Sequence, residues 1–90
     1  MLPTNRKPVH PGEVLWEEFL KPNKMTQLEL AKKMKVPVQR INTLINEKRG
    51  ITPETAILLA RAFGTSPQFW MNLQTNYDLF AAQAAMSDAA

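Results

Sequence analysis

A chain of 90 residues, 44% of them hydrophobic and 21% charged, has the composition of one small folded domain. It contains no cysteine, which excludes disulfides, thiolate zinc sites and cysteine nucleophiles, and a domain this small has little room for a deep catalytic pocket. Residues 1–12 lack the apolar core of a signal peptide, and no apolar run approaches the roughly 20 residues of a membrane-spanning helix. We therefore expect a cytoplasmic protein without a membrane segment.

The net charge of +3 is distributed unevenly along the chain. Residues 21–49 contain eight basic and two acidic side chains, so this stretch carries 8 − 2 = +6, whereas no basic residue follows Arg61. Such a concentration indicates a local surface that binds a polyanion. On charge alone, a lysine-rich solvated surface is the simpler interpretation.

The first two predicted helices occupy the N-terminal part of the chain. The first begins near residues 11–12 and should end before Pro22, because the residue preceding a proline is disfavoured in helical geometry. The second begins after Thr26, a good N-cap with which Glu29 forms a capping box, and continues through Met34.

Three further helices are predicted, each with a proline near its start. Pro37 suits the entry to the third helix, which Gly50 or the residues just before it should end. The fourth starts at residues 52–53 and ends at Gly64. The fifth covers about residues 67–82, and the alanine-rich tail either extends it or frays. No strand signal competes, so we predict an all-α fold class, a compact five-helix single domain over residues 1–90.

The second and third helices are short, and the connection between them is about three residues long. A tight connection between short helices is what a helix-turn-helix needs, here over about residues 26–47. In that motif the first helix crosses the DNA backbone and the second enters the major groove. Many small bundles contain such a turn without binding DNA, so the turn alone leaves the function open.

The third helix adds a polar face that suits base recognition. At about 100° per residue, Gln39, Thr43 and Asn46 fall on one line opposite the apolar side, and Arg40 and Asn42 flank that line. A solvated helix usually carries Glu and Lys, which are good helix formers. Gln and Asn can instead bond adenine, Arg can bond guanine, and a Thr methyl can touch the methyl of thymine. We therefore predict base contacts by Gln39, Arg40, Asn42 and Thr43.

The flanking residues suit the DNA backbone. Gln27 lies at the N-terminus of the second helix, where the helix dipole and free N–H groups favour an anion. Lys48 and Arg49 follow the third helix and can hold the backbone on its other side. Such contacts set affinity and salt dependence rather than sequence choice.

Residues 26–70 resemble the Xre/Cro-type helix-turn-helix domain of phage repressors, which implies a lambda-repressor-like fold. The matching positions are Thr26-Gln27, Leu30-Ala31, Val36, Ile41, Leu44 and the LARAFG of residues 59–64. HPGEVL at 10–15 and TSPQFWMNLQTNYDL at 65–79 resemble the HigA/VapI branch, the antitoxins of HigBA-type toxin–antitoxin modules. The resemblance covers about residues 8–80, and FWMNLQTNYDL is its most specific part.

The resemblance implies a homodimer that binds a palindromic operator, represses its own operon and neutralises a small RelE-like mRNA-cleaving toxin, without cofactor or metal. By matching positions, Val38, Gln39 and Thr43 face bases, whereas Gln27, Asn46, Lys48 and Arg49 contact the backbone.

The sequence departs from the family pattern at two positions. Val38 replaces a polar residue common in phage repressors, so an apolar contact to a thymine methyl would replace a hydrogen bond. Lys35 stands where glycine is frequent. A left-handed backbone there would strain a non-glycine residue by roughly 1 kcal/mol, so we expect a slightly reshaped turn.

The sequence also bears on functions other than DNA binding. An enzyme is disfavoured: the single histidine, His10, has a local role at the first helix, and the adjacent Glu17 and Glu18 point in different directions. A stand-alone Xre-type regulator and a non-DNA-binding interaction module remain alternatives. The fifth helix is more aromatic than a small core requires, and we predict that Tyr77 and Phe80 lie in a two-fold dimer interface.

Overall fold

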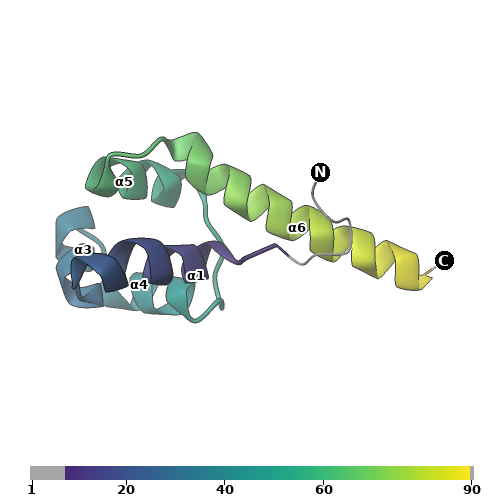
Figure 1. Cartoon of the computed structure of the whole chain (residues 1–90), viewed down its shortest axis with the longest axis horizontal. Helices are drawn as coiled ribbons and strands as arrows, with labels where there is room; N and C mark the ends of the chain where they lie inside the picture. The colour runs from purple at the N-terminus through teal and green to yellow at the C-terminus, as the bar shows by residue number, and fades with distance from the viewer. Residues whose placement is uncertain (1–7, 90) are drawn as a thin grey trace.

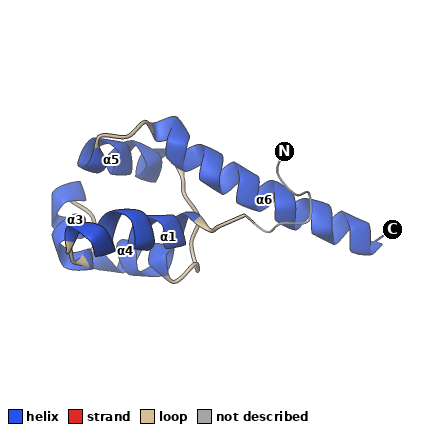
Figure 2. Cartoon of the chain, in the orientation of Figure 1, coloured by secondary structure: helices blue, strands red, loops and turns tan. Residues whose placement is uncertain are grey.

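The computed structural model describes residues 8–89, with side chains as far as Ser87. These residues form five helical stretches and no strand (Figure 2), as predicted. The first stretch has three consecutive parts, α1 (Pro11–Val14), the π-helical η1 (Leu15–Leu20) and α2 (Lys21–Asn23). The others are α3 (Gln27–Met34), α4 (Val38–Ile45), α5 (Pro53–Phe63) and α6 (Pro67–Ala89).

Two groups of helices face each other across the core (Figure 1). The stretch that begins with α1 lies with α3 and α4 on one side, and α5 with the first part of α6 lies on the other. The second half of α6 extends beyond the other helices. With α6 included, the molecule is 46 Å long and 26 Å wide. Apolar side chains that are exposed on this half include Leu79 and Met86.

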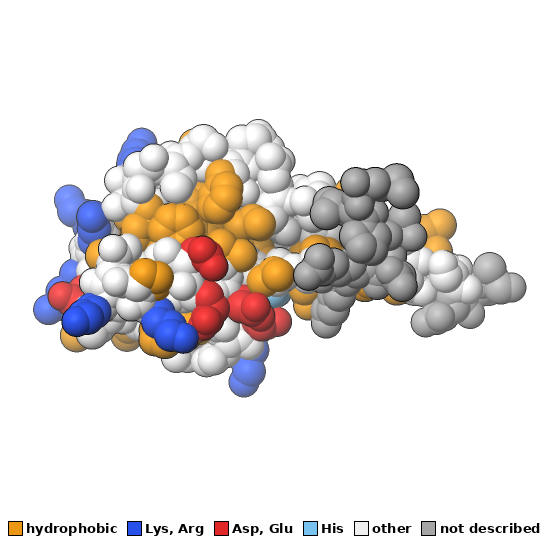
Figure 3. Space-filling view, viewed as in Figure 1, with side chains coloured by type: hydrophobic (Ala, Val, Ile, Leu, Met, Phe, Trp, Pro, Cys, Tyr) orange, Lys and Arg blue, Asp and Glu red, His pale blue; other side chains and the backbone are white. Residues whose placement is uncertain are grey.

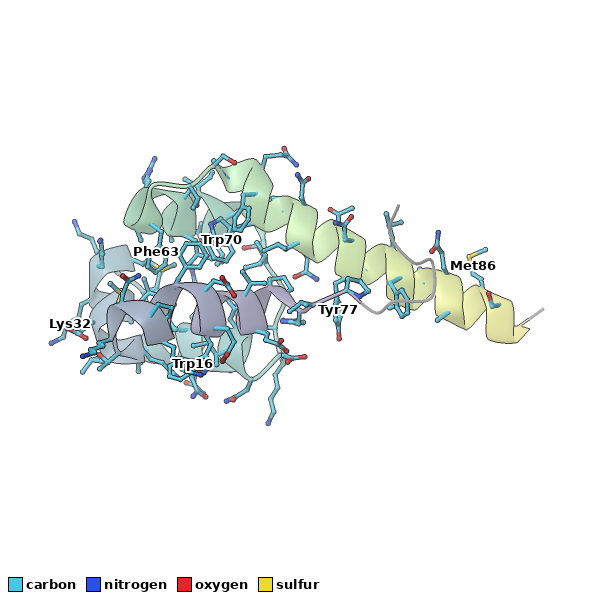
Figure 4. All side chains as sticks on the ribbon, in the orientation of Figure 1. Trp16, Lys32, Phe63, Trp70, Tyr77 and Met86 are labelled. Carbon is cyan, nitrogen blue, oxygen red and sulfur yellow. The ribbon has the colours of Figure 1, made fainter. Side chains whose placement is uncertain are left out.

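The core is closed by aromatic side chains from both groups. Trp70 of α6 is fully buried, and its indole Nε1 donates a hydrogen bond to Oγ1 of Thr65 at 2.8 Å. The ring of Phe19 lies 5.0 Å from Trp70 and 4.9 Å from Phe63, measured between centroids. Figure 4 shows Trp70 and Phe63 between α5 and the first helical stretch. Other buried apolar residues are Pro11, Leu15, Leu20, Leu30, Ala31, Met34, Ile41, Leu44, Ile51, Ala56, Leu59 and Ala60.

Four helical stretches end with a residue in the left-handed conformation: Lys24, Lys35, Glu47 and Gly64, with φ between 53° and 70°. In each case the N–H of the next residue bonds back to a carbonyl five positions earlier, the Schellman arrangement. Three of the four residues are not glycine, and each carries a strain of about 1 kcal/mol. The expected reshaping of the turn at Lys35 is wrong, because the lysine adopts the left-handed geometry that the family often gives to glycine.

The prediction that the first helix ends before Pro22 is wrong. The chain stays helical through Asn23, because η1 changes the hydrogen-bond register just before the proline. The N–H of Lys21 donates to the carbonyl of Trp16, five residues back, instead of to Glu17. A proline in an α-helix collides with the carbonyl four residues before it. The wider π turn moves that carbonyl away from the ring, so the chain stays helical for one more turn.

The end of α4 also differs from the sequence-based expectation, whereas the tail follows one of the two alternatives given for it. The helix predicted to run toward Gly50 ends at Ile45, and Glu47 takes the left-handed position instead. The amide N–H of Lys48 then closes the helix end by donating to the carbonyl of Thr43 at 2.9 Å. The alanine-rich tail extends α6 to Ala89, consistent with the high helix propensity of alanine.

His10 and Gly12 place the start of α1 against two other helices. Nδ1 of the buried His10 accepts a hydrogen bond from the N–H of Gly12 at 2.9 Å and so caps the helix, the local role predicted for it. A Cβ atom on Gly12 would lie 1.9 Å from the carbonyl oxygen of Leu44, so only glycine allows α1 to approach α4 this closely. The start of α1 therefore packs directly against the backbone of α4 at Leu44.

Candidate nucleic-acid interface

The N-terminus of α3 is built by the predicted capping box. The hydroxyl of Thr26 accepts from the N–H of Glu29 at 3.1 Å, and the carboxylate of Glu29 accepts from the N–H of Thr26 at 2.8 Å. The bond from the Thr26 N–H lowers the pKa of the Glu29 carboxyl most, and a hydrogen bond to the carboxyl from the Thr26 side chain lowers it further. Gln27 is the first residue of the helix, where free N–H groups favour an anion.

A tight turn separates α3 from α4, and Pro37 occupies the N-cap position of α4. The apolar Ile41 and Leu44 are buried, and Ile45 is half-buried, so the predicted inner face is correct. Val38, at the first position of the helix, is 41% exposed. Its methyl groups are thus available at the helix end that approaches bases most closely in a helix-turn-helix.

Thr43 uses its hydroxyl within the helix. Oγ1 donates to the carbonyl of Gln39, 2.9 Å away, and also lies 3.1 Å from the carbonyl of Arg40. The hydroxyl proton is therefore occupied, which leaves the methyl group and an oxygen lone pair for a ligand. The side chain of Gln39 is exposed, with both its amide donor and its carbonyl acceptor on the surface.

Three predicted contact residues form one hydrogen-bonded chain across the two helices. Nδ2 of Asn42 donates to Oε1 of Gln27 at 3.2 Å, and Oδ1 of Asn42 accepts from Nδ2 of Asn46 at 3.2 Å. The chain links α3, where Gln27 is expected to meet phosphate, to the middle and end of α4. The amide of Asn42 is thus oriented before any ligand arrives.

Arg40 has a partner that the sequence did not indicate. Its Nη1 lies 3.2 Å from Oε1 of Glu54 in the first turn of α5. The guanidinium is more covered than the carboxylate, with 29% and 73% of the side chains exposed. The pair turns Arg40 toward α5, whereas the neighbouring Gln39 carries no such restraint. The only local signal for Glu54 is its place in a helix start, and no pattern connects it to a residue 14 positions earlier.

The polar residues of α4 border a shallow hollow with the loop that follows. The hollow has a volume of about 240 Å³ and is lined by Pro37, Gln39, Arg40, Thr43 and Arg49. Three predicted base-contacting residues are therefore brought together with one member of the Lys48–Arg49 pair. Lys48 is exposed in the same loop but does not line the hollow.

The basic side chains concentrate at the end of the molecule opposite the projecting half of α6. Figure 3 shows Lys and Arg gathered around the end formed by α3, and Figure 4 places Lys32 there, far from Met86. In this view one acidic side chain lies among them, and the other visible acidic side chains lie nearer the middle of the molecule. On this face, part of the predicted basic region of residues 21–49 thus lies at the end formed by α3.

Tyr77 and Phe80, the residues predicted for a dimer interface, lie on α6 and are both half-buried. The ring of Tyr77 stands edge-on to that of His10, with centroids 4.9 Å apart. Tyr77 therefore joins α6 to the start of α1 within one chain, in addition to any role between chains.

Between residues 8 and 89, no cluster of three or more His, Cys, Asp or Glu side chains could hold a metal ion. No helix in that range is long and apolar enough to cross a membrane.

Comparisons with known proteins agree with this geometry. Residues 17–70, more than half of the chain, match the helix-turn-helix family model. The virulence-associated protein I of Dichelobacter nodosus is 49% identical over 83% of this chain and 69% of its own length. The antitoxin HigA-1 of Vibrio cholerae is 42% identical over 89% of this chain and 75% of its own.

A solved structure of the Pseudomonas aeruginosa antitoxin HigA with the higBA promoter has a TM-score of 0.87. It is 45% identical in sequence, and the match covers 91% of this chain and 89% of that one. The family consists of DNA-binding regulators rather than enzymes. The capped α3, the tight turn and α4 all lie within the matched residues, and the chain belongs to the Xre-type helix-turn-helix family of DNA-binding proteins, in its HigA/VapI branch of antitoxin regulators.

Proposed function

We propose that this chain binds a palindromic operator as a homodimer, represses its own operon and neutralises a RelE-like mRNA-cleaving toxin. The single observation that carries the DNA part is the exposed polar face of α4. It presents Gln39 and Thr43 beside Arg49 around one hollow.

The reading helix offers two kinds of base contact. Gln39 can bond adenine through both ends of its amide, and Val38 and the Thr43 methyl can contact thymine methyl groups. Asn42 is held by Gln27 and Asn46, so it contributes to this surface with a fixed amide orientation. Arg40 would reach a base only by leaving or sharing Glu54, which makes it the least direct of the predicted base contacts.

The backbone contacts fall on both sides of the reading helix. Gln27 and the N-terminus of α3 approach the phosphates on one side, and Lys48 and Arg49 approach them on the other. Asn46 lies between these sides, at the C-cap of α4. A two-fold dimer would place two such surfaces on successive half-sites about 34–36 Å apart.

The operator contacts are tested by measuring binding to DNA from upstream of the protein's own gene over a series of salt concentrations. The double variant Lys48→Ala, Arg49→Ala should weaken all DNA binding and reduce the salt slope by about one unit for each lost phosphate contact. Arg61→Ala is a control that removes an exposed positive charge outside residues 21–49 and should leave the slope unchanged. An unchanged slope in the first variant would move the phosphate contacts to another part of the surface.

The toxin partner is tested by purifying the tagged protein from its native host. A small basic protein that co-purifies, and whose mRNA cleavage stops when the two are mixed, would identify the antitoxin function. If the operator binds and no such protein is recovered at any growth stage, the chain is a stand-alone Xre-type regulator.

A further inference from the structure

Gln74 of α6 contacts the loop that carries the proposed DNA-backbone residues. Its Oε1 accepts a hydrogen bond from the backbone N–H of Ile51 at 2.6 Å. Ile51 is 5% exposed, and it lies two residues after Arg49 in the segment between α4 and α5. A side chain of α6 therefore bonds to the backbone of the segment between α4 and α5.

The orientation of the Gln74 amide is determined by a second bond. Its Nε2 donates to Oδ1 of Asp78, one turn later on α6, at 2.9 Å. A carboxylate accepts hydrogen bonds and cannot donate them when ionised, so Asp78 selects the nitrogen of the amide. The oxygen is then left to face the N–H of Ile51. Both bonds form only when the Gln74 amide has this one orientation.

Gly50 leaves the space that Gln74 occupies. A Cβ atom at Gly50 would lie 2.8 Å from Oε1 of Gln74 and 3.0 Å from its Nε2. A side chain at Gly50 would therefore require the Gln74 amide to shift. The Schellman bond from the N–H of Lys48 to the carbonyl of Thr43 holds the start of the same segment. Lys48, Arg49 and Gly50 therefore lie between two backbone hydrogen bonds, one at the N–H of Lys48 and one at the N–H of Ile51.

We propose that Gln74 is a positioning residue for DNA binding, which holds the Lys48–Arg49 segment so that both cations meet the phosphate backbone. This role rests on the proposed backbone contacts of Lys48 and Arg49. Gln74 does not touch DNA in this arrangement. It acts through its contacts with Ile51 and Gly50. The position of Lys48 and Arg49 therefore depends on the position of α6.

The first test compares two equal substitutions on the same helix. Gln74→Leu removes the bond to Ile51, whereas Gln68→Leu removes an exposed bond between Gln68 and Asn72 that reaches no other element. Operator binding is measured for each at several salt concentrations, with helical content and Tm recorded beside it. Gln74→Leu should bind more weakly with a salt slope shallower by about one unit, while Gln68→Leu should retain the wild-type slope. Wild-type affinity and slope in folded Gln74→Leu would overturn the proposal.

The second test is a double-mutant cycle. In the Lys48→Ala, Arg49→Ala background, Gln74→Leu should cause no further loss of operator affinity, since the groups that it positions are absent. Full additivity of the two losses would overturn the positioning role. A wild-type slope in the Lys48→Ala, Arg49→Ala protein itself would contradict the proposed backbone contacts instead, so the two failures are distinguishable.

Two further variants address the geometry without touching Gln74. Asp78→Asn keeps an acceptor oxygen for Nε2 and should bind the operator like the wild type, whereas Asp78→Leu should weaken binding in the same manner as Gln74→Leu. Gly50→Ala should displace the amide and reproduce the shallower slope. If Asp78→Leu and Gly50→Ala both bind with wild-type affinity and slope, the loop is positioned by other contacts and the proposal is wrong.

Discussion

At the scale of single residues, the polar groups of α4 are arranged before DNA binds. Asn42 is held between Gln27 and Asn46, and Arg40 is turned toward Glu54. Ordering side chains in advance reduces the entropy cost of association. Gln39 is left exposed beside these restrained neighbours, so we expect it to provide the largest share of the discrimination between bases.

Thr43 allows the methyl and hydroxyl contributions to base recognition to be separated. Because its hydroxyl donates to the carbonyl of Gln39, Thr43→Val should bind the operator within a few-fold of the wild type. Thr43→Ser, which loses the methyl group, should cost on the order of 1 kcal/mol of operator affinity. Fluorescence anisotropy with the operator and with unrelated DNA measures both. Stronger binding by Thr43→Ser than by Thr43→Val would show that the hydroxyl reads the base.

At the scale of elements, the reading helix depends on how its neighbours begin and end. The capping box of α3 holds Gln27 at the helix start, and the Schellman bonds at the end of α4 direct Lys48 and Arg49 into the following loop. The close approach of α1 at Gly12 holds the backbone of α4 at Leu44 in place.

Gly12→Ala tests that close approach. An alanine methyl would overlap the Leu44 carbonyl, so the two helices must separate. We expect a loss of about 2–3 kcal/mol in the free energy of unfolding, the usual cost of overpacking a tight contact. Urea denaturation measures the loss. Gly64→Ala is the control for a general effect of replacing glycine, because nothing lies within 4 Å of a Cβ atom at that position. Its left-handed φ adds strain but no steric overlap. A Gly12→Ala protein as stable as the wild type would contradict the packing argument.

The capping box predicts a pH dependence of stability. The folded pKa of Glu29 lies below its unfolded value, so the carboxylate stabilises the fold above the unfolded value and the contribution is lost as the pH falls through the folded one. In Glu29→Gln the side-chain oxygen still accepts from the N–H of Thr26 but does not titrate. The stability difference between wild type and Glu29→Gln should therefore shrink as the pH falls below about 4. Chemical denaturation from pH 7 to pH 3 measures the free energy of unfolding of both proteins. A stability difference that does not change with pH would show that the negative charge of Glu29 does not stabilise the fold.

At the scale of the whole molecule, the two ends differ in chemistry. One end carries the basic residues and the reading helix, and the other is the projecting half of α6 with exposed Leu79 and Met86. Apolar surface that extends from a compact body is typical of an interface. This arrangement supports the proposed dimer, in which α6 would pair with a second copy and leave both reading helices free.

The dimer is tested at Phe80, because Tyr77 also packs against His10 within the chain. Phe80→Asp should reduce the solution mass from dimer to monomer at micromolar concentration and weaken binding to a two-half-site operator much more than to a single half-site. Light scattering after gel filtration measures the mass. Thr75→Asp introduces the same charge on an exposed position of α6 and should leave the dimer intact. A wild-type protein that is strictly monomeric would contradict the interface.

By itself, the sequence determined the elements and the family. Period-3.6 apolar spacing, the Thr26–Glu29 box and the prolines near helix starts are local signals, and they placed the helices and the inner face of α4 correctly. Where these signals misled, a neighbouring turn had changed the hydrogen-bond register. The π turn carried the first helix past Pro22, and Glu47 ended α4 before Gly50.

Only the tertiary structure decided which distant side chains meet. Arg40 with Glu54, Asn42 with Gln27, and Gln74 with Ile51 join residues 14, 15 and 23 positions apart, so no local periodicity encodes them. Such pairs depend on the angles at which whole helices pack, and those angles follow from close contacts such as Gly12 against Leu44. The residues that face DNA could thus be proposed from the sequence, whereas the contacts that hold them in place could not.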